Sequence, residues 1–474
     1  MNPPLSRRDW LTRAACGFGG LALAGLEAQA NAPSKASNPL AARLPLIAPK
    51  AKRVIFLFMQ GGVSQIDSFD YKPSLFAQDG KQMPFDDARV IANTGARGTN
   101  QRVMKPLWNF SQHGESGRWA SDLFPATNEH VDDLCFIHSL HTEGVAHGPA
   151  TLFLHCGATN FVRPSMGAWT AYGLGTENAD LPGFVSIAPS SGNGGPRNYG
   201  SAFLPPVYQG TPIGKASDPP SKATIRDLKG SLASSDREAL FGLLRDVNAE
   251  QLRRVPGDAE FEAVVNSYEL AGRMQLTAPD ALDLSQETEE TKSLYGIGDP
   301  ATDTYGQRCL LARRMCEAGV RFIQVTYGDD GANPAWDQHS NMPKHGDHAK
   351  AVDRPIAGLL ADLKRRGLLE DTLVWWGSEF GRTPYSQGNG TGRDHNPGGF
   401  TVWLAGGGVK PGFAYGETDE FGHAAIASKV HMHDLHATIL HLLGIDHERL
   451  TYRYAGRNFR LTDVHGKVVK GILV

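Results

Sequence analysis

Cysteine is scarce in this chain. Five cysteines occur among 474 residues, and Cys16 lies in the N-terminal segment that precedes the folded part. The other four, Cys135, Cys156, Cys309 and Cys316, are widely spaced and form no Cys-x-x-Cys pair. This pattern excludes a disulfide scaffold, a cysteine-based zinc motif, a c-type haem attachment site and an iron–sulfur cysteine set.

Other common signatures are missing as well. The first apolar run is not followed by Gly-x-Gly-x-x-Gly, which argues against a dinucleotide-binding turn. The net charge is −3, and the chain has no basic run and no amphipathic stretch typical of a membrane surface. The sequence therefore predicts neither a nucleic-acid partner nor a membrane partner, and a redox enzyme has little support.

The first thirty residues predict an export signal. Ser6-Arg7-Arg8-Asp9-Trp10-Leu11 is a twin-arginine pattern, residues 17–26 are small and apolar, and Ala28-Gln29-Ala30 is a cleavage site. The alternative is a chance arginine pair in a disordered start. We predict a Tat signal peptide at 1–30, a Pro/Ala/Ser-rich linker at 31–50, and a periplasmic or extracellular mature protein.

From residue 51 onwards, strongly apolar runs alternate with helical patterns. Runs that are apolar at nearly every position are typical of strands buried on both faces of a parallel sheet. Six such strands are predicted at 53–62, 133–140, 184–189, 319–328, 371–379 and 400–408, and three helices at 304–317, 353–366 and 433–444. This alternation predicts an α/β fold, a three-layer αβα sandwich with a mainly parallel sheet, in one domain spanning 51–474.

Two local details belong to this prediction. The helix at 353–366 is expected to carry Pro355 in its first turn, and the helix at 433–444 is expected to use Asp434 as its N-cap. The hydrophobic periodicity weakens at about 190–300, where Gly/Pro-rich sequence surrounds two helical patterns at 236–252 and 258–274. We interpret this region as an insertion.

Carboxylates and imidazoles gather where the predicted strands end or begin. They follow four strands and precede a fifth: Ser64 and Asp67, His147, Asp337 and His339, Glu379, and then Asp394 and His395. Ligands of α/β sheets bind beyond the carboxyl ends of strands, and carboxylate with neutral imidazole is a donor set for zinc or manganese. Any one of these residues could instead cap a helix or hold a loop, so the prediction of a metal site depends on their convergence.

Three segments carry a family resemblance. They are GLLADLKRRGLLEDTLVWWGSEFGRTP (358–384), DHNPGGFTVWLAGGGVKPG (394–412) and DLHATILHLLGID (434–446). They resemble successive parts of the alkaline phosphatase-like superfamily, which includes sulfatases. The whole mature chain is similar to the exported sulfatase-like family called domain of unknown function 1501, through its Tat signal, the Gly-Gly after the first strand, Asp-x-His, Ser-Glu-Phe-Gly-Arg-Thr and Asp-His.

The resemblance implies roles for individual residues. Asp337, His339 and His395 match a first-metal set of one Asp and two His, and Asp394 would be a ligand or a partner that orients an imidazole. Glu379 takes the position of a second-metal Asp, which is followed in relatives by a ligand His. The metal would be zinc, manganese or calcium, with its identity and number left open.

Three positions depart from the superfamily pattern, and one motif is missing. Phe380 stands where the ligand His is expected, and Gln60 stands where the first strand of phosphatases ends in a metal-bridging Asp, so that Ser64 or Asp67 would have to compensate. His147 occupies the position of the nucleophile. The chain has no Cys-x-Pro-x-Arg, so formylglycine chemistry is not expected.

Arg382 is the remaining candidate. A guanidinium is planar, always charged and able to bind an oxyanion with two hydrogen bonds, which suits a sulfate or phosphate ester. The alternative is a salt bridge that holds the loop.

The sequence thus predicts an exported metal-dependent hydrolase of sulfate or phosphate esters, acting on a small-molecule or carbohydrate ester. The attacking group would be a metal-activated water, with Ser64 or His147 as less favoured nucleophiles. The alternative is a catalytically degenerate sulfatase-like fold that acts as an exported carbohydrate- or partner-binding protein.

Overall fold

The computed structural model describes residues 39–85, 100–178, 180–219, 223–225, 234–254, 259–387 and 390–474. The predicted signal peptide at 1–30 and the first part of the predicted linker lie outside the described residues. Residues 39–50 contain no helix or strand and run along the folded part, where the N–H of Ile47 donates to the carbonyl of Gly444 at 3.1 Å.

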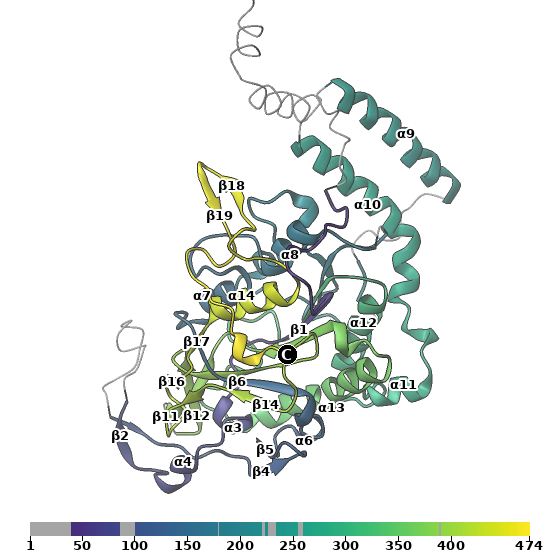
Figure 1. Cartoon of the computed structure of the whole chain (residues 1–474). Helices are drawn as coiled ribbons and strands as arrows, with labels where there is room; N and C mark the ends of the chain where they lie inside the picture. Colours follow the sequence, from purple (N-terminus) through teal and green to yellow (C-terminus); the bar gives the residue numbers. More distant parts are fainter. Residues whose placement is uncertain are drawn as a thin grey trace, which may run out of the picture.

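A nine-stranded sheet forms the centre of the molecule (Figure 1). Its order is β14 (Phe413–Tyr415), β6 (Leu134–His141), β13 (Phe400–Ala405), β10 (Thr372–Gly377), β1 (Arg53–Met59), β9 (Phe322–Tyr327), β7 (Phe184–Ile187) and β8 (Thr211–Ile213), with β17 (Val430–His431) pairing with β6. All six predicted strands are present. The three that the sequence did not predict, β8, β14 and β17, have only two or three residues each, too few for a recognisable apolar run.

One strand runs against the others. β1, β9, β10, β7 and β8 pair in parallel, whereas β13 is antiparallel to both of its neighbours, β10 and β6. The start of β13 therefore lies at the same edge of the sheet as the carboxyl ends of β1, β9 and β10. Residues before β13 can meet residues that follow the parallel strands.

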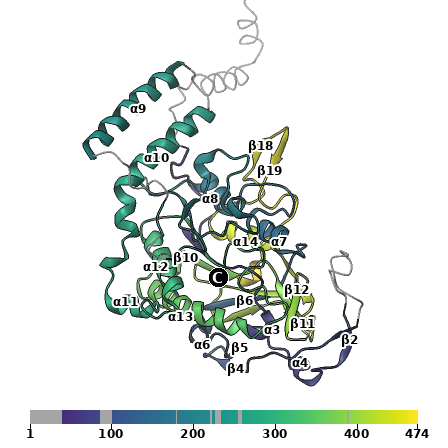
Figure 2. The same cartoon turned by 180° about the vertical axis from the view of Figure 1, so that it is seen from behind.

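Helices cover both faces of the sheet and complete three layers. Figures 1 and 2 show α7 (His147–Cys156), α8 (Met166–Leu174) and α14 (Met432–Leu442) on one side, and α12 (Asp303–Glu317) and α13 (Lys344–Arg365) on the other. The predicted αβα sandwich with a mainly parallel sheet is confirmed. The central strands are mostly apolar because the helical layers exclude water from both faces. Within the sheet, the rings of Phe56 on β1 and Trp375 on β10 stack with centroids 3.6 Å apart.

Two helix starts differ from the prediction. α13 begins at Lys344, so Pro355 lies inside the helix and not in its first turn, because the buried side chains of Ala349 and Val352 continue the apolar face towards the N-terminus. The N-cap of α14 is His431, whose ring accepts the N–H of His433, while Asp434 closes a capping box from the third helical position. His431 was missed because histidine is not a preferred N-cap residue.

The region at 190–300 contains the two predicted helices as a hairpin. α9 (Ser234–Arg254) and α10 (Ala259–Leu282) extend from the body of the molecule, as Figure 1 shows in teal. Within the described residues, no helix combines the length and apolar character that a membrane crossing needs. Cys135, Cys156, Cys309 and Cys316 are buried and free.

The stretch after β10 forms a second small sheet. β11 (Gly381–Gln387) pairs with β12 (Gly392–Asn396), and this pairing sets Arg382 opposite His395. The remaining elements are α3 (Gln65–Ser68), α4 (Pro73–Ala77), α6 (Pro125–Asn128), α11 (Glu289–Leu294), and the strand pairs β2 (Gln82–Pro84) with β3 (Asn100–Arg102), β4 (Phe110–His113) with β5 (Arg118–Ser121), β15 (Glu417–Thr418) with β16 (Ala425–Ala427), and β18 (Tyr452–Tyr454) with β19 (Arg457–Phe459).

The turn after β1 allows two segments to touch. Gly61 has a φ of +118°, and a Cβ atom there would lie 2.8 Å from the backbone nitrogens of both Trp336 and Asp337. Only glycine combines this backbone conformation with such close contact.

We expect Gly61→Ala to lower the free energy of unfolding by at least about 1 kcal/mol more than Gly80→Ala, because overlap is added to backbone strain. Gly80 is the matched control, since its φ is +80° but no atom lies within 4 Å of its would-be Cβ. Urea unfolding of both variants measures the difference. Equal losses would show that the Gly61 turn and residues 336–337 do not pack as described.

Candidate metal centre

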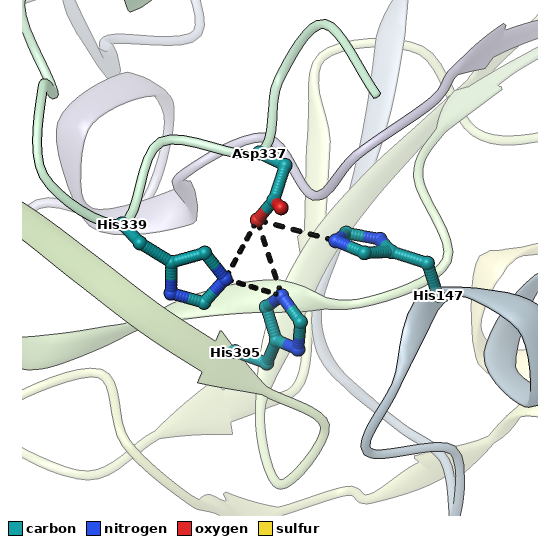
Figure 3. Close-up of side chains that lie close together, drawn as sticks. All are labelled: His147, Asp337, His339 and His395. Carbon is teal, nitrogen blue, oxygen red and sulfur yellow. Dashed lines mark hydrogen bonds and ion pairs between the residues drawn. The ribbon is translucent and has the colours of Figure 1, made fainter. Parts of the chain in front are cut away.

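Four side chains converge at the edge of the sheet where the parallel strands end. Figure 3 shows Asp337 with its carboxylate turned towards the rings of His147, His339 and His395. Its Oδ1 lies 2.8 Å from the Nε2 of His339, 3.1 Å from that of His147 and 3.2 Å from that of His395. Among the described residues, this is the one group of three or more His, Cys, Asp and Glu side chains whose ligand atoms all lie within 4.8 Å of one another.

The fold explains why these four residues meet. Asp337 and His339 belong to the segment that follows β9, and His147 opens α7, shortly after β6. His395 precedes β13, and it reaches the same edge because β13 is antiparallel. The sequence analysis grouped Asp337, His339 and His395 as metal ligands and assigned His147 to the nucleophile position; the structure brings all four together.

The outer nitrogens of the three rings are held by oxygen atoms. The Nδ1 of His147 lies 2.7 Å from Glu379 Oε1, the Nδ1 of His395 lies 2.9 Å from the carbonyl of Val145, and the Nδ1 of His339 contacts Gln387 Oε1. A carbonyl or ionised carboxylate oxygen can only accept, so each Nδ1 of a neutral ring carries the proton. Each Nε2 then directs a lone pair at the centre of the cluster.

These lone pairs require a positive partner. The Nε2 atoms of His339 and His395 are only 3.0 Å apart, and both face the negatively charged Oδ1 of Asp337. In neutral rings these atoms repel one another, whereas a divalent cation between them would satisfy every lone pair. Three imidazoles and one carboxylate, with Nδ1 protons fixed by oxygen acceptors, are a donor set that fits zinc or manganese.

The charge states of these four side chains also suit a cation. A proton on an Nε2 acts on Asp337 as a cation would: burial disfavours this carboxylate, but hydrogen bonds from the three imidazoles and the charge of Arg382 outweigh the burial and hold the pKa of this carboxyl well below its usual range. Burial lowers the pKa of His395 to about 3 against the opposing hydrogen bond to Asp337, so this ring is neutral. Burial also disfavours the His147 cation, yet its hydrogen bonds to Asp337 and Glu379 raise the pKa of His147.

Glu379 is not one of the four converging side chains, but it contacts one of them, His147. It is fully buried, its two carboxylate oxygens each accept the N–H of Gly61 at 3.0 Å, and Oε1 accepts the Nδ1 proton of His147. The sequence predicts a metal ligand at this position. In the structure Glu379 contacts the outer nitrogen of His147, where it orients the ring and fixes its tautomer.

Phe380 closes the side of the cluster where relatives are expected to keep a second ligand imidazole. It is fully buried, and its ring centroid lies 4.3 Å from that of His395 and 5.0 Å from that of His147. The apolar ring supports the two imidazoles by packing and offers no lone pair.

Arg382 is fully buried, so its position differs from that of a substrate-binding arginine. Its guanidinium donates to Asp337 Oδ1 at 2.8 Å, to the carbonyl of Trp336 at 3.1 Å and to the carbonyl of Gly62 at 2.9 Å. A further nitrogen donates to the carbonyl of Arg393 at 3.2 Å. This geometry matches the alternative given by the sequence, a salt bridge that holds the loop.

Comparison with known proteins identifies the family. A family model for proteins of unknown function (DUF1501) matches residues 51–473. The chain belongs to the DUF1501 family. No curated protein matches it by sequence.

Solved structures overlap with this DUF1501 chain only loosely. A sulfatase from Pseudoalteromonas sp. is 12% identical and has a TM-score of 0.34, with 90% of this chain and 72% of that chain covered. A protein of the alkaline phosphatase superfamily from Vibrio parahaemolyticus is 10% identical, with a TM-score of 0.36 and coverage of 86% and 70%. An alkaline phosphatase from the Antarctic bacterium TAB5 is 11% identical, with a TM-score of 0.32 and coverage of 77% and 94%.

Two of the residues predicted for the DUF1501 site belong to a different buried network. Ser64 donates to Asp67 Oδ2, and the same oxygen accepts the Nε proton of Arg393 at 2.8 Å. Ser64 and Asp67 are fully buried, and Asp67 is not part of the converging group. The structure does not bring this pair to the metal cluster.

Asp394 and Gln60 lie next to the site but outside the four converging side chains. Asp394 Oδ1 accepts the N–H of His395 at 2.7 Å and lies 3.7 Å from the Nδ1 of His339. Gln60 is fully buried, and its side-chain nitrogen donates to Ser190 at 3.3 Å. Asp394 thus holds the backbone of His395 and lies near the ring of His339.

Sequence reasoning missed the acceptors that hold the rings. Gln387 carries no motif that distinguishes it from other glutamines, and the carbonyl of Val145 is a backbone atom with no sequence signal. His147 had a usable signal, because a histidine that opens a helix after a buried strand lies at the ligand-binding edge of an α/β sheet.

We expect the purified mature protein to contain one divalent ion per chain, and Asp337→Asn or His395→Ala to lose it. His113→Ala is the matched control, since His113 lies on β4 outside the cluster. Mass-spectrometric metal analysis and unfolding temperature with added zinc or manganese test this. Metal content should fall on acidification, because protons compete for His147, whose pKa is raised. A purified protein that contains no metal, and whose unfolding temperature does not change when zinc or manganese is added, would contradict the assignment.

We expect Glu379→Gln to weaken metal affinity by about 10- to 100-fold, because it removes the charge that orients His147. At saturating metal the variant should still hold its ion, since the four ligand atoms remain. Competition with a chromogenic chelator measures the affinity, and Glu417→Gln, an exposed carboxylate on β15, serves as the control. A stoichiometric loss of metal in Glu379→Gln would show that Glu379 is itself a ligand.

Proposed function

We propose that this DUF1501 protein is an exported metal-dependent hydrolase of sulfate or phosphate esters. The observation that carries the proposal is the convergence of three imidazole Nε2 atoms and one carboxylate oxygen, each ring fixed from behind by an oxygen acceptor. A divalent ion in this cluster would supply Lewis-acid polarisation of an ester oxygen and a water of lowered pKa.

The protein's own part is to keep the ligand set rigid and correctly charged. Arg382 neutralises Asp337 within the protein, and Glu379 accepts the Nδ1 proton of His147. Preorganised groups of this kind need no reorganisation when charge develops in a reaction.

The geometry favours water over a side chain as the attacking group. Both nitrogens of His147 are engaged, one by Glu379 and one towards Asp337. Ser64 is buried against Asp67, away from the cluster. Neither side chain presents a free nucleophile to an ester, so we assign the attack to a water molecule.

A substrate can approach from the side of His339. Its side chain is 31% exposed, compared with 8% for His147 and 3% for Asp337. We propose a small-molecule or carbohydrate ester as the substrate. The twin-arginine pattern at 6–11 supports export to the periplasm or the cell exterior.

A second candidate function is a catalytically degenerate binding protein for carbohydrates or a partner. Phe380 favours it, because an apolar ring occupies the side where relatives are expected to bind a second ion. In this case the single-ion cluster would stabilise the fold, as four-ligand zinc sites do.

We expect the metal-loaded mature protein to hydrolyse a member of a panel of aryl sulfates, aryl phosphates and phosphodiesters. His395→Ala should lower kcat/KM by at least about 100-fold, since the ion contributes several kcal/mol of charge stabilisation. His113→Ala should keep the activity. A metal-loaded protein that turns over none of the esters would favour the binding protein instead.

A further inference from the structure

A cavity adjoins the metal cluster at His395. Its volume is about 380 Å³, within the range of small-molecule sites. His395 and the following residues Asn396 and Pro397 form part of its lining. The side chains that give the cavity its chemistry are Phe85, Tyr385, Phe421, His423, Asp419 and Glu420.

The aromatic rings stand at different angles around Phe85. The Phe421 ring is nearly perpendicular to it, at 83° with centroids 5.6 Å apart, and the His423 ring is at 76° and 5.4 Å. Tyr385 is tilted by 42° at 5.0 Å. Rings arranged in this way present several faces and edges to one cavity and do not form a single flat stack.

The wall that carries Phe421 and His423 is preorganised. Asp419 Oδ1 accepts the N–H groups of Phe421 and His423 at 3.0 and 2.9 Å. The turn contains Gly422 at a φ of +77°, and the carbonyl of Gly422 accepts a hydrogen bond from Gln65 at 2.8 Å. A wall held from both sides loses little conformational freedom when a ligand binds.

The charge of the lining has one sign. The described residues that line the cavity include two carboxylates, Asp419 and Glu420, and no lysine or arginine. Asp419 already accepts three backbone N–H groups, whereas the exposed Glu420 accepts a hydrogen bond from the hydroxyl of Ser74 at 3.3 Å. Among the described residues of the lining, an anionic group would meet no counter-charge, whereas a cation would meet aromatic side chains and a carboxylate.

We propose that this cavity binds an apolar cation of the quaternary ammonium type, which forms the alcohol portion of the ester substrate. Aromatic faces attract such cations through their quadrupoles, and a nearby carboxylate adds a charge interaction. The assignment of this cation to a substrate rests on the proposed hydrolase function. The binding of the cation itself depends only on the cavity.

Direct binding to the mature protein tests the charge preference. The probes are 4-(trimethylammonio)phenol and 4-tert-butylphenol, which have nearly the same shape and differ in charge. Calorimetric titration should show the ammonium compound binding at least about three-fold tighter, as expected for a cation–π contact. Equal or tighter binding of the neutral compound would overturn the proposal.

Variants of the lining locate the site. Phe421→Ala should weaken ammonium binding by about 3- to 30-fold, and Glu420→Gln should weaken it by about three-fold in low salt and less in high salt. Phe76→Ala is the matched ring control, since this exposed phenylalanine lies on α4 outside the cavity lining. Glu420 is exposed, so its replacement keeps the test valid even if Phe421→Ala folds poorly. Unchanged binding in Glu420→Gln and in folded Phe421→Ala would overturn the site.

One further variant separates this proposal from the hydrolase function. His339→Ala removes a metal-cluster side chain that does not line the cavity, so it should lose ester turnover and keep ammonium binding. Ammonium binding without hydrolysis of any ester would overturn the proposed function alone. Ester hydrolysis without ammonium binding would overturn the cation site alone.

Discussion

The buried ion pair between Arg382 and Asp337 is the contact on which the site depends. One guanidinium joins the carboxylate to the backbone carbonyls of Gly62, Trp336 and Arg393. These carbonyls belong to the turn after β1, the segment after β9 and the strand β12, so a single side chain connects three segments that are distant in sequence. Removal of one partner would leave a buried charge unpaired and lower the free energy of unfolding by about 3–5 kcal/mol. The position of Asp337 is therefore coupled to the folding of this edge of the sheet.

The site also depends on the antiparallel direction of β13, which could not be predicted from the sequence. The alternation of apolar runs and helices was enough to predict the layers, six of the strands and the gathering of Asp337 and His339 behind a strand. It did not reveal that β13 runs antiparallel, because an apolar run reads the same in either direction. The Asp-His pair before this strand was predicted to lie at the ligand edge without knowledge of the strand's direction, and the antiparallel pairing supplies the physical reason.

The details of the site needed three-dimensional contacts. Arginine is almost never fully buried unless paired, and nothing in the chain near Arg382 announces that its partner is Asp337, 45 residues earlier. The glycines between Pro384 and Asp394 favour a loop, yet β11 and β12 pair around them and set Arg382 opposite His395. Strand pairing outweighs local composition here, because the hairpin gives hydrogen-bond partners to backbone groups that a buried loop would leave without them.

The roles of Glu379 and Phe380 follow from the same geometry. A carboxylate that accepts both a backbone N–H and the Nδ1 proton of His147 has its lone pairs directed at neighbours within the protein. Beside it, Phe380 places an apolar ring against the imidazoles of His395 and His147. Together the two residues flank one group of four converging side chains, with an orienting carboxylate on one side and a hydrophobic support on the other. His395 belongs both to this group and to the lining of the aromatic cavity, so an ion held by the group would lie next to the side chains that we propose to select the substrate.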